Sequence, residues 1–292
     1  MADRVCVRLE GRAVLELGGE DRRTFLQGLI SNDVNKVDAG HAIWAALLTP
    51  QGKFLHDLFI VEAGERFLID AEAARIEELK KKLSIYKLRA KVTLGLAQGL
   101  VVCAIPGEGA LAALGLPAEA GAALERDGGV VYVDPRLPAL GARAILPETA
   151  DLGLPIGSFA DWDRTRLVLG VPDGSRDLPI EKAILLENGF DELKGVDFNK
   201  GCYMGQELTS RTKYRGLVRK RLMPVSIDGP TPEAGTAVMT GETEAGEMRS
   251  ANGNLGVALI RLEHFRAGAP LTCGGAKLTP KQPAWAVFPE GD

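Results

Sequence analysis

Glycine and proline recur along the whole chain and divide its apolar segments into short pieces, which restricts the folds that it can adopt. The sequence contains 35 glycines and 16 prolines among 292 residues. Because these residues favour turns and end regular elements, their density predicts a fold rich in loops and short strands. The chain is nevertheless long enough for two or three lobes, each with its own core.

The first half of the chain mixes strand and helix patterns. Segments 43–48 and 54–61 are predicted to be strands joined by the turn Thr49-Pro50-Gln51-Gly52, which indicates a hairpin. Segment 71–84 has the apolar spacing of an amphipathic helix. A similar, looser order of strands and helices follows between 100 and 146, so we expect α+β lobes with mixed sheets and not a doubly wound parallel sheet.

The C-terminal part changes character and becomes a series of short strands separated by glycines, starting near Arg219. Such a series predicts a small β-barrel or sandwich. We therefore expect three domains: an N-terminal α+β lobe at 1–98, a second α+β lobe with the cysteine motif at 99–221, and a C-terminal β-barrel at 222–292.

Charge and cysteine usage exclude several classes of protein. The net charge of −4 argues against general nucleic-acid binding, and no run reaches the ~20 apolar residues of a membrane helix. The N-terminus lacks the apolar region of a secretory signal. Four widely separated cysteines fit a reducing compartment, so we expect a cytoplasmic protein without a protein-only metal site; they are Cys6, Cys103, Cys202 and Cys273.

The octapeptide Lys200-Gly-Cys-Tyr-Met-Gly-Gln-Glu207 places one thiol between two glycines and close to several cations. Glycine lets the backbone turn sharply and approach a partner closely. Nearby cations favour the thiolate, the form that attacks electrophiles and binds metals; these are Lys200, Arg211, Lys213 and Arg215. A free cysteine is commonly a small buried hydrophobe, but this context favours an exposed reactive or metal-ligating Cys202.

The chemistry of this thiol stays open at the level of the residues. A nucleophilic cysteine normally needs a base, and no histidine lies near Cys202 in sequence, although His41 or His56 could approach it in space. Alternatively, one thiolate could supply a single ligand to an iron–sulfur cluster, which generally takes four. Tyr203, Gln206 and Glu207 could line the same pocket, although Glu207 could also form a surface ion pair.

Two further features each allow a functional and a plain interpretation. The basic stretch 211–221 could hold an anion such as a polyglutamate tail or a phosphate, or it could be a solvated strand pair. Asp57 interrupts an apolar strand, which suggests a buried or cleft-facing carboxylate, although a surface aspartate is commoner. Asn32-Asp33 could simply end a helix.

The cysteine motif, with the following Leu-Thr-Ser-Arg-Thr and Arg219-Lys-Arg221, resembles the signature of the YgfZ-type folate-binding proteins, relatives of the glycine-cleavage T-protein, GcvT. Segments 25–34, 47–53 and 86–89 resemble earlier parts of that superfamily in order. Segments 166–172 and 176–179 are similar to the branch that includes the mitochondrial iron–sulfur cluster assembly factor of the IBA type.

The resemblance implies a three-lobed aminomethyltransferase-like ring around a folate-sized channel. It also implies help in [4Fe–4S] cluster assembly or repair, directly or for radical-SAM enzymes such as those of tRNA modification. Iron–sulfur carrier proteins and client cluster enzymes would be the partners, with no direct nucleic-acid or membrane contact. Tetrahydrofolate and a transient shared iron–sulfur cluster would be bound.

Within this resemblance Cys202 is the expected catalytic and metal-binding residue, beside the channel. The side chains of Asp33, Asp57 and the Tyr86–Arg89 neighbourhood would face the channel. The full set of expected cofactor-binding residues is Asp33, Asp57, Tyr86, Arg89, Lys200, Tyr203, Gln206, Glu207 and Arg211.

One position departs from the T-protein pattern. T-proteins carry a glutamate that holds the pteridine in an Arg-x-Glu-x-Gly sequence, and this chain has Val168 there. An unmatched buried polar group costs ~1–3 kcal/mol, so we expect weakened folate binding. We hypothesise an accessory factor, and not a classical enzyme, that acts in iron–sulfur cluster assembly through Cys202. The alternatives are a tetrahydrofolate-dependent aminomethyl or one-carbon transferase and a ligand-free scaffold for carrier proteins.

Overall fold

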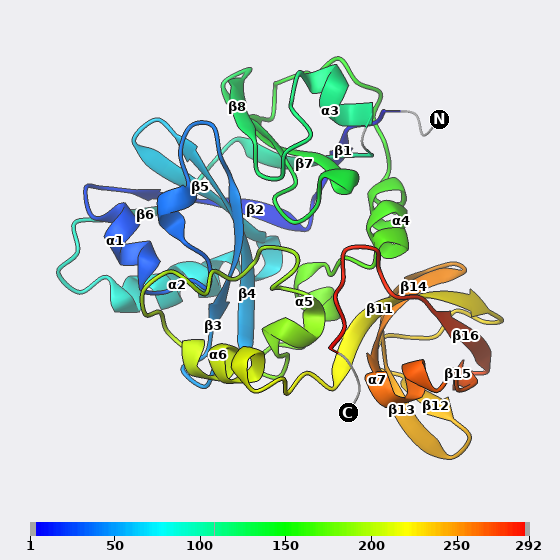
Figure 1. Cartoon of the computed structure of the whole chain (residues 1–292). Coiled ribbons are helices and arrows are strands. Elements are labelled where there is room, and N and C mark those ends of the chain that lie inside the picture. The colour runs from blue at the N-terminus through cyan, green and yellow to red at the C-terminus, as the bar shows by residue number, and fades with distance from the viewer. Residues whose placement is uncertain (1–3, 108, 290–292) are drawn as a thin grey trace.

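The strands among the described residues form two five-stranded sheets and one closed barrel. The computed structural model describes residues 4–107 and 109–289. In Figure 1 the first sheet lies on the left in blue, the second lies above it in green, and the barrel lies at the lower right in orange. The expected α+β class with a small C-terminal β-barrel is therefore confirmed. Within the described residues, no helix is long and apolar enough to cross a membrane.

The first sheet has the strand order β3-β4-β5-β2-β6, with every pair antiparallel. The predicted hairpin is present as β3 and β4. Its elements are β2 (Arg12–Gly18), β3 (Ile43–Leu48), β4 (Phe54–Ala63), β5 (Arg66–Glu72), β6 (Thr93–Leu96), α1 (Arg22–Gln27) and α2 (Ile76–Tyr86). The helix expected at 71–84 begins later, because a 3-10 turn, Ala73–Arg75, precedes it.

Strand β3 is buried at every residue because both faces of the first sheet are covered. Ile43, Ala45 and Leu47 belong to the core under α1 and α2. Trp44, Ala46 and Leu48 belong to a core that spans both sheets. The strand therefore has an almost continuous apolar sequence in place of alternation.

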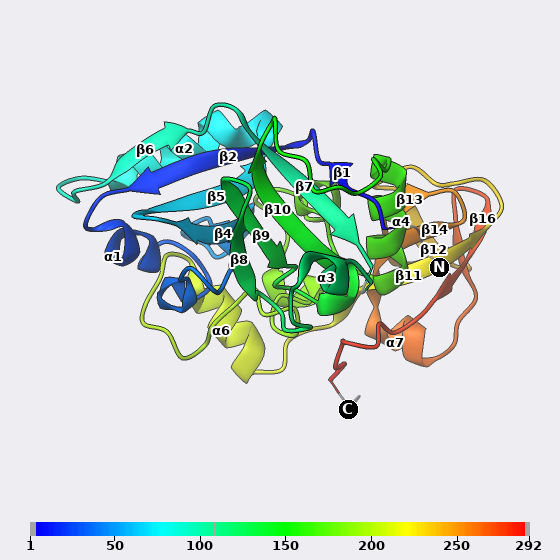
Figure 2. The ribbon, with the colours of Figure 1, turned by 90° about the horizontal axis from the view of Figure 1, so that it is seen from above.

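The second sheet has the order β1-β7-β10-β9-β8 and is also antiparallel. Its elements are β1 (Val7–Arg8), β7 (Leu100–Pro106), α3 (Gly109–Leu114), β8 (Ala123–Arg126), β9 (Gly129–Val133) and β10 (Gly141–Pro147). Strand β1 pairs with β7, although the chain continues directly into β2 of the first sheet. This crossing joins the two sheets, which lie side by side in Figure 2.

In the chain between β10 and β11 lie the short helices α4 (Phe159–Leu169), α5 (Gly174–Asp177) and α6 (Gln206–Tyr214) and a 3-10 turn at Leu185–Asn188. Two other 3-10 turns, Val34–Lys36 and Pro138–Leu140, follow α1 and β9. Helix α5 lies within the proline-bounded segment 172–179 and has only four residues. Helix α6 was not expected. It buries only Thr209 and Thr212, so it carries no apolar stripe that a sequence pattern would reveal.

The barrel closes in the order β11-β14-β13-β12-β15-β16. Its elements are β11 (Lys220–Asp228), β12 (Ala237–Thr240), β13 (Thr243–Asn252), β14 (Leu255–Arg261), α7 (Leu262–Arg266), β15 (Leu271–Cys273) and β16 (Ala276–Pro280). Strands β15 and β16 are separated by a turn at Gly274 and Gly275, which both have positive φ angles.

Candidate functional site

Cys202 is exposed, as expected, and lies in the loop that leads into α6. Backbone hydrogen bonds attach both sides of this loop to the segment that follows α1. The amide of Asp197 donates to the carbonyl of Ser31 at 3.0 Å, and the amide of Met204 donates to the carbonyl of Gly28 at 3.0 Å. The loop runs in yellow-green toward α6 in Figure 1. The thiol is therefore displayed on a segment that is tied down on both sides.

Lys200 anchors this loop. Its ammonium group donates to the backbone carbonyls of Gln27, Ile30 and Asn32 at 2.8, 2.6 and 2.7 Å. Burial lowers the pKa of Lys200 to about 8. We had expected the ammonium of Lys200 to lie close to the thiol of Cys202. Instead, three backbone carbonyls occupy its three N–H donors, so Lys200 fixes the loop.

The second glycine of the motif brings the loop against the β3–β4 turn. Gly205 has a φ of +79°, and a Cβ atom there would lie 2.4 Å from the carbonyl oxygen of Thr49. Gly52 has a φ of +80°, and its Cβ would lie 2.6 Å from the carbonyl oxygen of Gly205. The close approach expected for a glycine beside the cysteine is therefore present at Gly205. At Gly201 a Cβ would meet open space.

The remaining residues of the motif either build the loop or face solvent. Tyr203 is buried, its ring lies 5.0 Å from the Lys200 ammonium, and burial raises its pKa to about 12. The side-chain carbonyl of Gln206 accepts a hydrogen bond from the Tyr203 amide at 3.2 Å. Glu207 and Arg211 are exposed on α6. These side chains do not enclose a pocket around the thiol.

The residues expected to face a central channel are spread over the molecule. Asp33 accepts from the Asn35 amide and the Gln27 side chain, both at 2.9 Å, and so caps a 3-10 turn. Asp57 is 1% exposed and forms an ion pair with Arg12 at 3.0 Å. Tyr86 and Arg89 are exposed at and just beyond the end of α2. The structure does not bring these residues to one cavity.

The centre of the molecule holds a buried network of charges that sequence reasoning missed. Asp70 accepts from Arg12 Nε and from Arg143 Nη2, each at 2.5 Å. The guanidinium of Arg143 lies 3.9 Å from the centre of the Phe59 ring. Arg12 is buried, which would lower its pKa, but the carboxylates of Asp57 and Asp70 raise it. The available signal was a charged residue inside two otherwise apolar strands, at Asp70 and Arg143.

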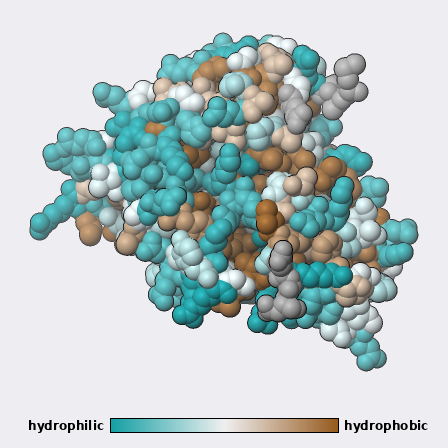
Figure 3. Space-filling view, in the orientation of Figure 1, coloured by the Kyte–Doolittle hydropathy of each residue, from teal (hydrophilic) through white to brown (hydrophobic). Residues whose placement is uncertain are grey.

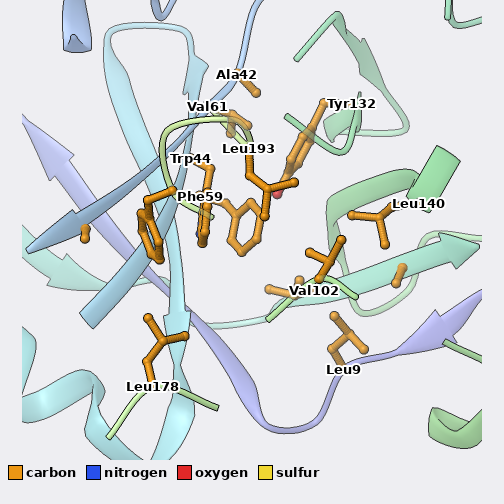
Figure 4. Packing of buried hydrophobic residues seen from close by; sticks show 14 of the residues in the cluster. Leu9, Ala42, Trp44, Phe59, Val61, Val102, Tyr132, Leu140, Leu178 and Leu193 are labelled. Carbon is orange, nitrogen blue, oxygen red and sulfur yellow. The ribbon is translucent and has the colours of Figure 1, made fainter. Parts of the chain in front are cut away.

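Aromatic side chains complete this centre. The rings of Trp44 and Phe190 stack with centroids 3.9 Å apart, and Trp44 Nε1 donates to Asp57 at 3.4 Å. Figure 4 shows Trp44 and Phe59 close together in the core that the two sheets share. Asp57 and Asp70 thus already have protein partners, and Val168 is 56% exposed to solvent. The residues present do not fit a pteridine held by these carboxylates.

The two histidines considered as partners for the thiol have other surroundings. His56 Nε2 lies 3.5 Å from Arg75 Nη2 and 3.8 Å from Glu78. Burial and then the Arg75 charge lower the pKa of His56 to about 4, so it is neutral near pH 7. His41 lines a cavity of about 470 Å³ together with Trp44. Neither histidine forms a hydrogen bond with Cys202 in the part of the chain that the structure describes.

A groove of about 390 Å³ opens beside the cysteine loop, between the β3–β4 turn and the end of α2. Met204, two residues after Cys202, forms part of its wall. We call it the α2 groove; it is lined by Leu47, Leu48, Thr49, Pro50, Gln51, Lys53, Leu55, Lys82, Ile85, Tyr86, Glu181 and Met204. Among residues 4–107 and 109–289, no group of three or more His, Cys, Asp or Glu side chains could hold a metal ion.

The chain is similar to known proteins along most of its length. A family profile described as the CAF17 C-terminal beta-barrel domain matches residues 219–288. The mitochondrial iron–sulfur cluster assembly factor IBA57 of Mus musculus is 33% identical over 287 residues, covering 89% of this chain and 78% of the relative. The factor of the same name from Homo sapiens is 34% identical over 284 residues, with the same coverage of 89% and 78%.

A solved structure supports the same architecture. The glycine cleavage system aminomethyltransferase T from Bartonella henselae superimposes with a TM-score of 0.78 over 98% of this chain and 87% of that chain, at 16% sequence identity. The expected aminomethyltransferase-like fold is thereby confirmed. The two IBA57 relatives are named as mitochondrial factors, so the expectation of a cytoplasmic location is contradicted.

Proposed function

Because this chain belongs to the IBA57 family of iron–sulfur cluster assembly factors, we propose that it assists the assembly or repair of iron–sulfur clusters through Cys202. The cluster is cargo in this role. A thiolate at Cys202 supplies one ligand, and a cluster generally takes four. An iron–sulfur carrier protein or a client enzyme supplies the others while the cluster is shared.

The observation that carries this proposal is an exposed thiol on an anchored loop. Lys200 and the contact between Gly205 and the β3–β4 turn hold the loop in place. Binding of a partner therefore costs little conformational entropy for ordering the loop. Binding of iron requires loss of the thiol proton to solvent. We further propose [4Fe–4S] clusters as the cargo and cluster enzymes, including those that modify tRNA, as clients.

Tetrahydrofolate takes no part in this proposal. Of the two carboxylates expected in its channel, Asp57 is paired with Arg12 and Asp33 caps a 3-10 turn. Val168 carries no acceptor for a pteridine. A folate-dependent transferase is disfavoured for the same reason, since it would use a cleft carboxylate for its chemistry. Such a transferase would also tolerate replacement of Cys202 by serine.

Anaerobic cluster reconstitution with a carrier protein tests the role of the thiol. Wild type is compared with Cys202→Ser and with Cys6→Ser, which removes a half-buried thiol elsewhere. We expect the visible absorption of a shared cluster in wild type and in Cys6→Ser, and its loss in Cys202→Ser with an unchanged circular dichroism spectrum. Equal cluster spectra from wild type and Cys202→Ser would show that the thiol has no such role.

A further inference from the structure

Three large apolar side chains are exposed together where α2 ends. Ile85 is 64% exposed, Tyr86 is 41% exposed and Leu88 is 88% exposed. Ile85 and Tyr86 form one side of the α2 groove, and Met204 contributes from the cysteine loop. Figure 3 shows a small hydrophobic area at the left edge of the molecule, near this end of α2. Contiguous exposed apolar surface beside a groove is typical of a protein interaction site.

The backbone around this groove is held in an unusual conformation. Leu88 has a φ of 41° and Glu181 a φ of 60°, both in the left-handed region that disfavours residues with a Cβ. The amide of Glu181 donates to the carbonyl of Phe54 at 2.8 Å, which fixes one wall to β4. Strained residues persist only where surrounding contacts determine them, so the groove wall is preformed.

Cations surround the groove. Lys53 and Lys82 line it, Lys87 and Arg89 follow its apolar residues, and Glu181 is the single acidic residue in its lining. Throughout the described chain, no side chain forms an ion pair or hydrogen bond with the side chains of Lys53, Lys87 or Arg89. A cationic rim around an apolar groove is complementary to an acidic segment that also carries apolar side chains.

An occupant of the groove would lie next to the thiol. Met204 is separated from Cys202 by one residue, so their Cα atoms are at most about 7 Å apart. The Met204 amide is bonded to the Gly28 carbonyl, which keeps this side chain in the groove wall. A protein seated in the groove therefore brings its own neighbouring groups within reach of Cys202.

We propose that the α2 groove is the docking surface for the protein that shares or receives the cluster, and that its occupant is an acidic segment with apolar side chains. This inference rests on the proposed function, because it identifies the surface that partner uses. Apolar side chains of the partner contact Ile85, Tyr86 and Met204, and its carboxylates approach Lys53 and Arg89. The steering charges make association fastest at low salt.

The test measures the affinity of a purified iron–sulfur carrier protein, loaded with its cluster, for variants of the full chain. Ile85→Glu/Arg89→Glu places carboxylates on the groove and should weaken binding at least tenfold. Ile156→Glu/Arg164→Glu makes the same two substitutions at an exposed isoleucine and an exposed arginine away from the groove, and should bind like wild type. All four positions are exposed, so thermal unfolding should be nearly unchanged.

Each outcome of this test either supports or overturns the α2 groove as the docking surface. Weakened binding in the groove variant alone, with a loss of affinity as salt rises, supports the docking surface. Equal weakening in both variants indicates unspecific charge attraction and overturns it, as does wild-type affinity in both or no binding to the wild type. If Cys202→Ser shares a cluster as well as wild type while the groove variant still fails to bind, the role of the thiol is wrong and the docking surface stands.

Discussion

The charged side chains in the centre of this molecule are paired with one another, whereas, within the described chain, most of those at the rim around the α2 groove are not. In the centre, the side chains of Arg12, Asp57, Asp70 and Arg143 are at most 7% exposed and are joined by ion pairs. At the rim, Cys202 is exposed and the cations around the α2 groove have no ion-pair partners among the described residues, apart from Lys82, which lies 3.6 Å from Glu78. The centre is thus saturated by protein groups, whereas the rim offers groups to another molecule.

This difference places the structural role in the centre of the molecule and the proposed function at its rim. An aminomethyltransferase-like architecture is retained, yet its middle is filled by paired charges and by the Trp44–Phe190 stack. A buried ion pair is stable only when both partners and their hydrogen bonds are in place. The charged side chains of the centre are therefore not free to bind another molecule. A thiol on the outside is free to work with a second protein. The following predictions test this division.

Removing the central carboxylate should give the largest effect. Asp70→Ala leaves Arg12 and Arg143 without the oxygen atoms that each contacts at 2.5 Å. Breaking a buried pair costs about 3–5 kcal/mol, so the free energy of unfolding in urea should fall by that amount. Glu148→Ala is the control, because it breaks the exposed Arg8–Glu148 pair and should cost less than ~1 kcal/mol. A loss below 1 kcal/mol for Asp70→Ala would mean that the centre is not a closed network.

An intermediate effect is expected at the rim from Gly205→Ala. The substitution introduces a side chain at φ +79° and against the Thr49 carbonyl, which should cost about 1–3 kcal/mol. The loop would separate from the β3–β4 turn, so alkylation of Cys202 by iodoacetamide should change in rate as well. Gly201→Ala should change neither the urea midpoint nor the alkylation rate, since open space surrounds that position. Equal behaviour of the two variants would contradict an anchored loop.

The sequence predicted what depends on local pattern. The β3–β4 hairpin follows from two apolar runs around Thr49-Pro50-Gln51-Gly52, and the barrel follows from glycine-separated strands. Helix α6 escaped prediction because it is polar, with only Thr209 and Thr212 buried. Its position is determined by contacts with other segments, including the side chain of Leu208 against Gly52. Periodicity within one segment does not report such contacts.

For the candidate site too, the sequence predicted local features but not contacts between distant residues. Two glycines around Cys202 indicated a displayed thiol, and the structure has it exposed. The role of Lys200 required the spatial meeting of residues 170 positions apart, since its ammonium bonds to the Ile30 carbonyl. The partners of Asp57 and Asp70 likewise come from different strands and, for Arg143, from the other sheet. A single sequence shows that Asp70 and Arg143 are charged residues within apolar strands, but it does not show that they pair with each other.

The smallest expected effect is the response to tetrahydrofolate. With Asp57 and Asp70 already paired, the ligand should not raise the melting temperature of this chain, although a ligand at one hundred times its dissociation constant would add ~2.7 kcal/mol. A glycine-cleavage T-protein measured in parallel is the positive control. Val168→Glu introduces the T-protein residue. Because this position is exposed, we expect that tetrahydrofolate does not raise the melting temperature of this variant either. Stabilisation of the variant alone would show that Val168 by itself excludes folate, and stabilisation of the wild type would show that the centre opens to admit it.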